Sequence, residues 1–355
     1  MLFHFVAKKF RVAPWLKAAG VLFSTIVGAG VLGLPFIVAR VGVVVGFLYI
    51  IAMGLLMCGI HLILAEIVIR TRRHFQLSGL MRLYLGRWAA ILMAIIFLGL
   101  HFGAMTAYLI GEGESLAAIF GGQPLAWSVI FFIIGSLIIM RGVRAIARFD
   151  WWISLLTIGV VALIVFLSAP HATQWTYFPA EFSSLLLPYG VLLFAFHGTS
   201  ALPELEMIVG TDAHALRKAV IVGSLVPIAL YALFAVTVVA VTGVSTSEIA
   251  TIELGRVVGP RMILIGNIFA IVAMSSSFVT IGQALRRSFQ WDYGVSPRIA
   301  FALAVGVPLV VYLAGAREFV RVIGFVGATC GTIEIILLLW AYEKNRHSRR
   351  RIRGN

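Results

Sequence analysis

The chain is poor in charged residues, because only 12% of its 355 residues are Asp, Glu, Lys or Arg. A soluble domain carries about twice that share, so the composition argues against a soluble globular protein. Cysteine is nearly absent, and both residues, Cys58 and Cys330, lie within apolar runs. We interpret them as small apolar packing residues rather than as a disulfide framework.

Residue patterns for catalysis are also missing. The sequence contains neither an H-E-x-x-H metal pair nor a P-loop with its phosphate-binding lysine. Catalytic His, Asp and Cys residues do not cluster on one predicted membrane face. We therefore expect that the chain is not an enzyme, and a membrane-embedded enzyme is the less favoured alternative.

Hydrophobic runs long enough to cross a bilayer recur along the whole chain, whose mean hydropathy is +1.04. They predict an all-α polytopic membrane protein with about ten transmembrane helices and one transmembrane domain over residues 1–355. The expected spans are 16–39, 42–69, 88–110, 124–140, 150–169, 183–209, 217–242, 261–285, 298–314 and 319–342.

Positive charge follows this ten-span topology. With the N-terminus in the cytoplasm, 23 of the 28 Lys and Arg residues fall on the inside, including the basic tail 343–355. Positive residues favour the cytoplasmic side, so we expect a multi-pass protein of the plasma membrane with both termini cytoplasmic. The net charge of +14 is then a topology signal, and we expect the bilayer, and no nucleic acid, as a partner.

Two glycine-proline motifs interrupt predicted spans one and six. Gly30 to Pro35 and Gly198 to Pro203 both read Gly-x-x-(Gly/Ala)-Leu-Pro. Glycine and proline are poor helix formers, and an open backbone at membrane depth persists where it lines a cavity. Matching breaks in two halves of a chain indicate the binding site of a secondary transporter.

The two breaks divide the chain into repeats of about 15–170 and 183–342. Because each repeat holds five spans, the two insert with opposite orientation, and helices one and six become partners that meet near the midplane. The expected fold is a 5+5 inverted repeat with helices one and six broken.

The first break predicts receptors for both charges of a zwitterion. The N–H groups of Ala29, Gly30 and Val31 begin a new half-helix, whose positive dipole end binds carboxylates. Glycine at positions 28 and 30 lets the anion reach the backbone. The carbonyls of Ile26 and Val27 are expected to be free to accept from an ammonium group or to coordinate a cation.

The second break is expected to complete the site with its own carbonyls. Those of Ala195, Phe196 and Thr199 offer the same chemistry, and Phe196 is placed to cover the ligand. A site with receptors for both charges suits an α-amino acid. The expected substrate-binding residues are Ile26, Gly28, Ala29, Gly30, Val31, Tyr108, Ala195, Phe196, His197, Gly198, Thr199 and Ser200.

These motifs resemble those of a known superfamily. The stretch from Gly28 to Pro35 is similar to the helix-one signature of the amino acid–polyamine–organocation superfamily, and 194–198 resembles its helix-six motif Phe-Ala-Phe-x-Gly. The following 200–204 is closest to the amino acid/auxin permease and aromatic amino acid permease branches. The resemblance implies a leucine-transporter-type fold. The chain differs from these branches in length, because many of their members have eleven or more spans and ten are expected here.

The resemblance also implies a coupling ion. In sodium-coupled relatives, an Ala-x-x-(Ser/Thr)-Ser pattern on helix eight completes a sodium site with helix-one carbonyls. Ala273, Ser276 and Ser277 match that pattern, so the implied metal ligands are Ile26, Val27, Ala273, Ser276 and Ser277. Close packing of small serines is the alternative interpretation.

Ionisable residues within the spans are candidates for function because they are costly in the bilayer. Glu334 and His197 are candidates for proton coupling, and Glu204 and Glu206 for a cytoplasmic gate with Arg11 or Lys17. We expect Tyr108 either to contact the substrate carboxylate or to pack at the membrane interface, and His61 to be structural. Glu112 and Glu114 are expected to form a solvated rim at the outer mouth of helix three.

The sequence thus predicts a secondary active transporter of amino acids, neutral or aromatic, working by alternating access. The coupling ion is Na⁺ or H⁺, and no other cofactor is expected. An amino acid sensor with a transporter fold is the alternative. The residues at the first break carry no carboxylate for a divalent metal, and no charged or carbonyl filter repeat indicates an ion channel.

Overall fold

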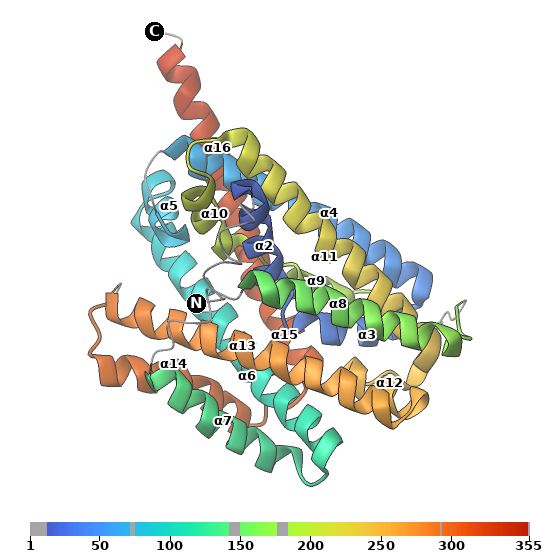
Figure 1. The fold of residues 1–355 in the computed structure, drawn as a ribbon. Coiled ribbons are helices and arrows are strands. Elements are labelled where there is room, and N and C mark those ends of the chain that lie inside the picture. Colours follow the sequence, from blue (N-terminus) through green and yellow to red (C-terminus); the bar gives the residue numbers. More distant parts are fainter. Residues whose placement is uncertain (1–12, 72–74, 142–149, 176–183, 292, 354–355) are drawn as a thin grey trace, which may run out of the picture.

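The structure is a computed structural model that describes residues 13–71, 75–141, 150–175, 184–291 and 293–353. Within these ranges the chain is helical and contains no strand (Figure 1). The longer helices are α2 (Pro14–Ile26), α3 (Gly30–Val41), α4 (Val43–Thr71), α6 (Arg87–Phe120), α7 (Pro124–Arg141), α8 (Asp150–Ser168), α11 (Ala213–Thr242), α13 (Pro260–Trp291), α14 (Pro297–Leu313) and α16 (Thr332–Arg353). Shorter helices are α5 (Leu77–Tyr84), α9 (Leu187–Ala195), α10 (Leu202–Val209), α12 (Ala250–Val258) and α15 (Phe319–Val326).

Every expected span holds helix in the described part of the chain. Six helices are long and apolar enough to cross a membrane: α4, α6, α7, α11, α13 and the α15–α16 segment. The bent pair α2–α3 makes a seventh. Shorter apolar helices cover the expected fifth and ninth spans, at Leu155–His171 and Pro297–Leu313, and α9 with α10 cover the sixth.

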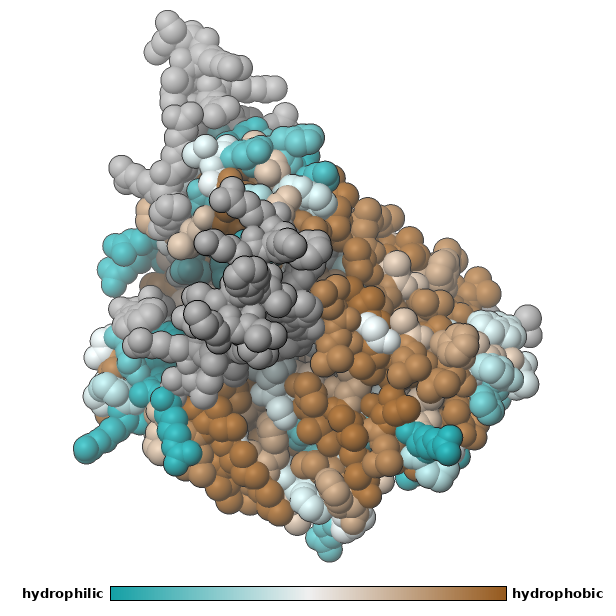
Figure 2. All heavy atoms as spheres, in the orientation of Figure 1, coloured by the Kyte–Doolittle hydropathy of each residue, from teal (hydrophilic) through white to brown (hydrophobic). Residues whose placement is uncertain are grey.

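The molecular surface has the character of a lipid-facing one. Large apolar side chains are highly exposed on several spans, including Phe166 at 74%, Leu156 at 59% and Ile134 at 54%. Figure 2 shows hydrophobic residues over the lower and right parts of one face, with hydrophilic residues gathered toward its margins. Contiguous apolar exposure of this extent suits contact with lipid rather than water.

Two sets of helices position the interior. The broken pair α2–α3 lies against α11 and α9, while α11 also packs along α4 and α6 packs along α13 (Figure 1). The broken helices are therefore held on the inside of the bundle, where their unpaired backbone groups are shielded from lipid.

The tenth span contains an irregular turn. A π-helical segment, η6 (Gly327–Gly331), separates α15 from α16. It packs against α9 so closely that a Cβ atom on Gly327 would lie 1.9 Å from the carbonyl oxygen of Gly190. Single-turn π segments are frequent at functional sites, and this one sets the rotation of α16 relative to the second break.

Some spans are longer than the hydropathy predicts. Helix α6 continues to Phe120, although the expected span ended at residue 110, and α13 continues to Trp291, although it was expected to end at 285. Gly121, with φ of 74°, ends α6 in a conformation that glycine adopts easily.

Candidate functional site

The first break separates α2 from α3 by three residues and bends the span by 58°. No backbone acceptor among the described residues binds the N–H of Ala29, and none of them donates to the carbonyl of Val27. The glycine-rich sequence predicts an anion receptor at this N–H and a cation receptor at this carbonyl, and neither group is engaged in a backbone hydrogen bond among the described residues.

The second break lies between α9 and α10, with a single 3-10 turn, η4 (Thr199–Ala201), inside it. Within the described residues, the carbonyl of Phe196 accepts no hydrogen bond, as expected. The carbonyl of Thr199 is not free, because the N–H of Leu202 donates to it. The expectation that this carbonyl is free is therefore wrong.

The two breaks meet through Tyr231 of α11. Its hydroxyl lies 2.8 Å from the carbonyl oxygen of Ile26 and 3.2 Å from that of Ala195, and it is fully buried. The carbonyls of Ile26 and Ala195 were expected to be free, and this hydroxyl occupies both. Sequence reasoning missed Tyr231. The one signal that could have indicated it is a tyrosine within an apolar span, because its hydroxyl needs a partner when buried.

Gly30 is explained by packing rather than by anion access. A Cβ atom at this position would lie 2.8 Å from the Cα of Ala195, so α3 and α9 approach each other closely here. At Gly28, the other glycine expected to admit an anion, a Cβ atom would meet only two hydroxyl oxygens, at ordinary contact distances. The contact with α9 gives Gly30 a packing role, and binding of an anion at its N–H stays a prediction.

Two hydroxyl groups border the space beside Gly28. A Cβ atom on Gly28 would lie 3.6 Å from the hydroxyl of Tyr108 and 3.7 Å from Oγ of Ser277. The hydroxyls of Tyr108 and Ser277 are hydrogen-bonded to each other. Residues from α6, α13 and the first break therefore converge on one small polar corner, next to the N–H of Ala29.

The residues of the expected sodium site do not all point toward this corner. Ser276 donates its hydroxyl to the carbonyl of Ala273, 3.0 Å away in its own helix. Ala273 lines an apolar cavity of about 330 Å³ between α8 and α13. The hydroxyl of Ser277 lies beside the first break, 3.7 Å from the position of a Cβ atom on Gly28.

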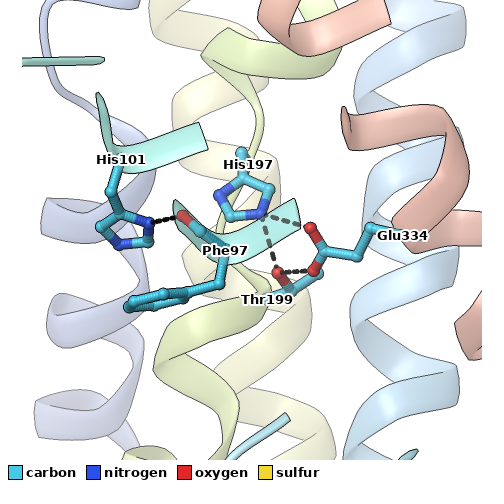
Figure 3. Close-up of polar contacts among 5 residues, drawn as sticks. All are labelled: Phe97, His101, His197, Thr199 and Glu334. Atoms are coloured by element: carbon cyan, nitrogen blue, oxygen red, sulfur yellow. Dashed lines mark hydrogen bonds and ion pairs between the residues drawn. The ribbon is translucent and has the colours of Figure 1, made fainter. Parts of the chain in front are cut away.

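The second break is held by an ionisable cluster from two distant parts of the chain (Figure 3). Nε2 of His197 lies 2.9 Å from Oε2 of Glu334, and the Thr199 hydroxyl donates to Oε1 of Glu334 at 2.5 Å. The same hydroxyl lies 3.0 Å from Nε2 of His197. The side chains of Glu334 and His197 are 3% and 16% exposed, so the structure joins the two proton-coupling candidates in a largely buried triad with Thr199.

Two further histidines flank the triad. His101 donates from Nδ1 to the carbonyl of Phe97 at 2.7 Å and lies apart from the triad in Figure 3. His61 is fully buried, with Nδ1 3.2 Å from Oγ of Ser224. A Cβ atom on Gly198 would lie 3.2 Å from Cε1 of His61, so this ring lies against the second break.

The gate candidates lie on α10, beyond the second break. Glu204 is exposed and Glu206 is half-buried. Lys17 is exposed on α2, and Arg11 lies outside the described residues. Ser200, also expected at the site, is half-buried in the η4 turn.

Glu112 does not lie on a solvated rim, and that prediction is wrong. Its side chain is 0% exposed and accepts a hydrogen bond of 2.6 Å from the hydroxyl of Ser275. The error has a simple cause, because α6 extends eight residues beyond Glu112 to Phe120. At 1.5 Å per residue, the carboxyl lies about 12 Å inside the end of the helix.

Comparisons with known proteins agree with the membrane architecture and the broken helices. A family model described as the tryptophan/tyrosine permease family matches residues 13–353. The chain is similar to glutamine transporter 2 of Aliivibrio fischeri, with 22% identity over 91% of this chain and 87% of the relative. It is also similar to tyrosine-specific transport system 1 of Haemophilus influenzae, with 24% identity over 89% of this chain and 85% of the relative.

Two solved structures share the fold. MhsT in complex with L-phenylalanine superposes with a TM-score of 0.66 and 17% identity, over 93% of this chain and 88% of that one. The inward-facing conformation of Mhp1 gives a TM-score of 0.70 and 13% identity, over 95% of this chain and 77% of that one. The overall fold is therefore the leucine-transporter-type inverted repeat with broken helices one and six.

Proposed function

The chain belongs to the tryptophan/tyrosine permease family, and from that premise we propose that it is a proton-coupled symporter of neutral L-amino acids. It is an integral, multi-pass membrane protein and an amino acid transporter. The proposal concerns the substrate, the residues that bind it and the ion that drives it. The single observation that carries it is the buried triad of His197, Thr199 and Glu334 at the second break.

The proposed substrate site is the polar corner beside Gly28. The N–H of Ala29 lies at the start of α3, where the helix dipole favours an anion. The hydroxyls of Tyr108 and Ser277 are hydrogen-bonded to each other, which leaves one hydroxyl proton of the pair as a further donor. An amino acid carboxylate fits this combination of donors. The carbonyls of Val27 and Phe196 remain for the ammonium group.

A neutral side chain is favoured by the surroundings of the corner. Phe196, at the second break, is 2% exposed and its ring centroid lies 5.1 Å from that of Tyr231, whose hydroxyl bonds the Ile26 carbonyl at the first break, so aromatic rings fill the space between the two breaks. The groups described beside Gly28 are hydroxyls rather than carboxylates or cations. The names of the relatives, which include tyrosine and glutamine transporters, point to the same class.

The contacts of Glu334 support proton coupling. While its carboxylate is ionised, Oε1 accepts from the Thr199 hydroxyl in the η4 turn and Oε2 accepts from Nε2 of His197. A proton on either oxygen removes one acceptor and the charge that strengthens both bonds. Protonation of Glu334 would therefore loosen the second break, which links proton binding to a change of conformation.

Sodium coupling is the second candidate, because Ser277 lies beside the first break. The structure supports it less well. Tyr231 donates to the carbonyl of Ile26, and Ser276 donates to that of Ala273. Three of the five expected ligands, Ile26, Ala273 and Ser276, are thus engaged in these bonds within the protein.

Uptake of radiolabelled tyrosine, tryptophan and glutamine into proteoliposomes tests the proposal. We expect a pH gradient, inside alkaline and without sodium, to drive accumulation, while a sodium gradient at matched pH does not. Glu334→Gln should lower pH-driven accumulation at least about tenfold, since one hydrogen bond to a charged group contributes about 1.5–3 kcal/mol. It should retain exchange of amino acids at equal pH.

The double variant Ser276→Ala/Ser277→Ala distinguishes the two ions. Accumulation driven only by sodium, and lost in this variant, would overturn proton coupling and favour the sodium site. Binding of amino acids without uptake under either gradient would instead indicate a sensor. A location in the plasma membrane, with both termini cytoplasmic and repeats of about 15–170 and 183–342, completes the proposal and is tested by cysteine accessibility in intact cells.

A further inference from the structure

A pocket lies between α4 and α11 at the predicted cytoplasmic end of the bundle. It has a volume of about 220 Å³, and both helices contribute to its lining: Leu62, Ala65, Glu66, Ile69, Arg70, Ala213 and Arg217. Figure 1 shows the two helices side by side, with the end of α4 and the start of α11 at the same end of the bundle. The transport site proposed above uses none of these residues.

The lining is charged at the membrane surface and apolar at depth. Arg70 lies in the last turn of α4 and Ala213 is the first residue of α11, so both lie where these helices leave the membrane. Leu62 lies eight residues before Arg70, about 12 Å deeper along α4, and Ala65 lies between them. A pocket with this division fits a molecule that has a charged head and an apolar tail.

The charged lining favours an anion. Glu66 is the one acidic lining residue, and both of its oxygens are engaged: Oε1 pairs with Arg70, and Oε2 accepts from the hydroxyl of Tyr342 at 3.2 Å. Arg217 is exposed, and no residue in the described part of the chain forms a hydrogen bond or ion pair with it. A guanidinium group has five N–H donors in a geometry that matches phosphate, so donors of Arg70 and all those of Arg217 remain for a ligand.

Two charged residues next to the lining are engaged elsewhere. Asp212 caps α11, and its Oδ1 accepts from the N–H of Ala215 at 2.9 Å. The ammonium group of Lys218 lies 3.9 Å from the centroid of the Trp15 ring, on α2. Arg217 is therefore the charged side chain of α11 that is left to hold an anion in the pocket.

An apolar track leads from the pocket toward the centre of the membrane. On α4, Leu55 lies two turns from Leu62 on the same face and is 52% exposed. On α11, Ile221 and Leu225 follow Arg217 at intervals of four residues and are 37% and 44% exposed. The charged end of the pocket is thus continuous with a surface that suits an acyl chain.

We propose that this pocket binds one anionic phospholipid, with its phosphate at Arg70 and Arg217 and an acyl chain along the track. Basic pockets between transmembrane helices on the cytoplasmic side are suited to anionic headgroups. The bound lipid joins the end of α4 to the start of α11, and only residues 210–212 separate α11 from α10, the half-helix of the second break. The lipid thereby fixes this half-helix relative to the membrane surface. The inference requires a membrane protein and is independent of the substrate and the coupling ion.

Native mass spectrometry of the purified chain in detergent tests the proposal. The protein is titrated with phosphatidylglycerol, which is anionic, or with phosphatidylcholine, which is zwitterionic, both carrying the same acyl chains. We expect the first phosphatidylglycerol to bind at a lower concentration than the first phosphatidylcholine. Arg217→Gln should weaken phosphatidylglycerol binding about fivefold, the loss typical of one basic residue at a membrane surface, and should leave phosphatidylcholine binding unchanged.

Further variants separate the pocket from the general charge of the surface. Arg82→Gln is the matched control, because it removes an exposed arginine from α5 at the same end of the bundle and should bind phosphatidylglycerol like the parent. Ala65→Leu fills the pocket without a change of charge and should also weaken binding. Ala213→Leu narrows the pocket from its exposed end and serves if Ala65→Leu does not fold.

Thermal unfolding provides the second readout. Phosphatidylglycerol should raise the unfolding midpoint of the parent and of Arg82→Gln more than that of Arg217→Gln, because the lipid joins two helices. Equal binding of the two lipids by the parent, or an equal loss of binding in Arg82→Gln and Arg217→Gln, would overturn the proposal. Inorganic phosphate that raises the midpoint as much as phosphatidylglycerol does would also overturn it, by assigning the pocket to a free anion.

Discussion

Replacing Gly28 by alanine separates the binding role of the first break from its packing role. The added methyl group would lie 3.6 Å from the Tyr108 hydroxyl and 3.7 Å from Oγ of Ser277, which are ordinary contact distances. The fold should therefore accept it. The same methyl occupies the corner where the substrate carboxylate is proposed to bind, so Gly28→Ala should lower the affinity for the amino acid.

The expected size of this loss follows from the hydrogen bonds displaced. One hydrogen bond to a charged group contributes about 1.5–3 kcal/mol, and each 1.4 kcal/mol is about a factor of ten in Kd. Gly28→Ala should thus weaken binding of the preferred amino acid roughly 10- to 100-fold. Its midpoint of thermal unfolding in detergent should stay close to that of the parent.

Gly30→Ala provides the contrast. Its methyl would lie 2.8 Å from the Cα of Ala195, so α3 must move away from α9, and overpacking of this kind costs about 1–3 kcal/mol. We expect a lower unfolding midpoint in this variant. Gly59→Ala in α4, where a Cβ atom would meet no other atom within 4 Å, is the neutral control. If Gly28→Ala is stable and binds amino acids like the parent, the substrate carboxylate does not lie beside Gly28.

Two further substitutions address the contacts that hold the breaks. Tyr231→Phe removes the hydroxyl that donates to the Ile26 carbonyl, and should lower the free energy of unfolding by about 1–3 kcal/mol. The measurement is the midpoint of thermal unfolding, which should fall. An unchanged midpoint would show that this bond contributes little. Gly327→Ala would place a methyl 1.9 Å from the carbonyl of Gly190 and push η6 away from α9. It should reduce stability and pH-driven uptake together, while Gly306→Ala, in open space on α14, should change neither.

The spans and breaks were predictable because their signals are local. Long apolar runs determine where helices cross the bilayer, and the glycines and prolines near Gly28 and Gly198 weaken the helix wherever they occur. The similarity of the two motifs at repeat-equivalent positions then indicated that the breaks meet. Their actual link, the hydroxyl of Tyr231, required knowing which face of α11 is turned inward, and hydropathy carries little information about rotation in a helix that is apolar on all sides.

The error at Glu112 has a related origin. Hydropathy falls where a carboxyl enters a span, so the expected third span ended at residue 110 and Glu112 was placed in water. A helix that is enclosed by other helices can continue past a polar residue, provided that the residue finds a partner inside the protein. Ser275 is that partner, and it lies 163 residues away in the sequence, which is why no local pattern pointed to it.

The pairing of His197 with Glu334 depends on the rotation of one helix about its axis. Each was recognisable alone as an ionisable residue in a span, but their contact requires a particular rotation of α16 about its axis. That rotation is determined by the π-helical turn at Gly327–Gly331, which inserts extra backbone into the span just before Glu334, and by the close approach of Gly327 to Gly190. The extra residue of a π turn rotates the following helix by about 100° relative to an uninterrupted one. An uninterrupted tenth helix would therefore direct Glu334 away from the second break, and the coupling proposed here depends on a local irregularity of the backbone as much as on the two side chains.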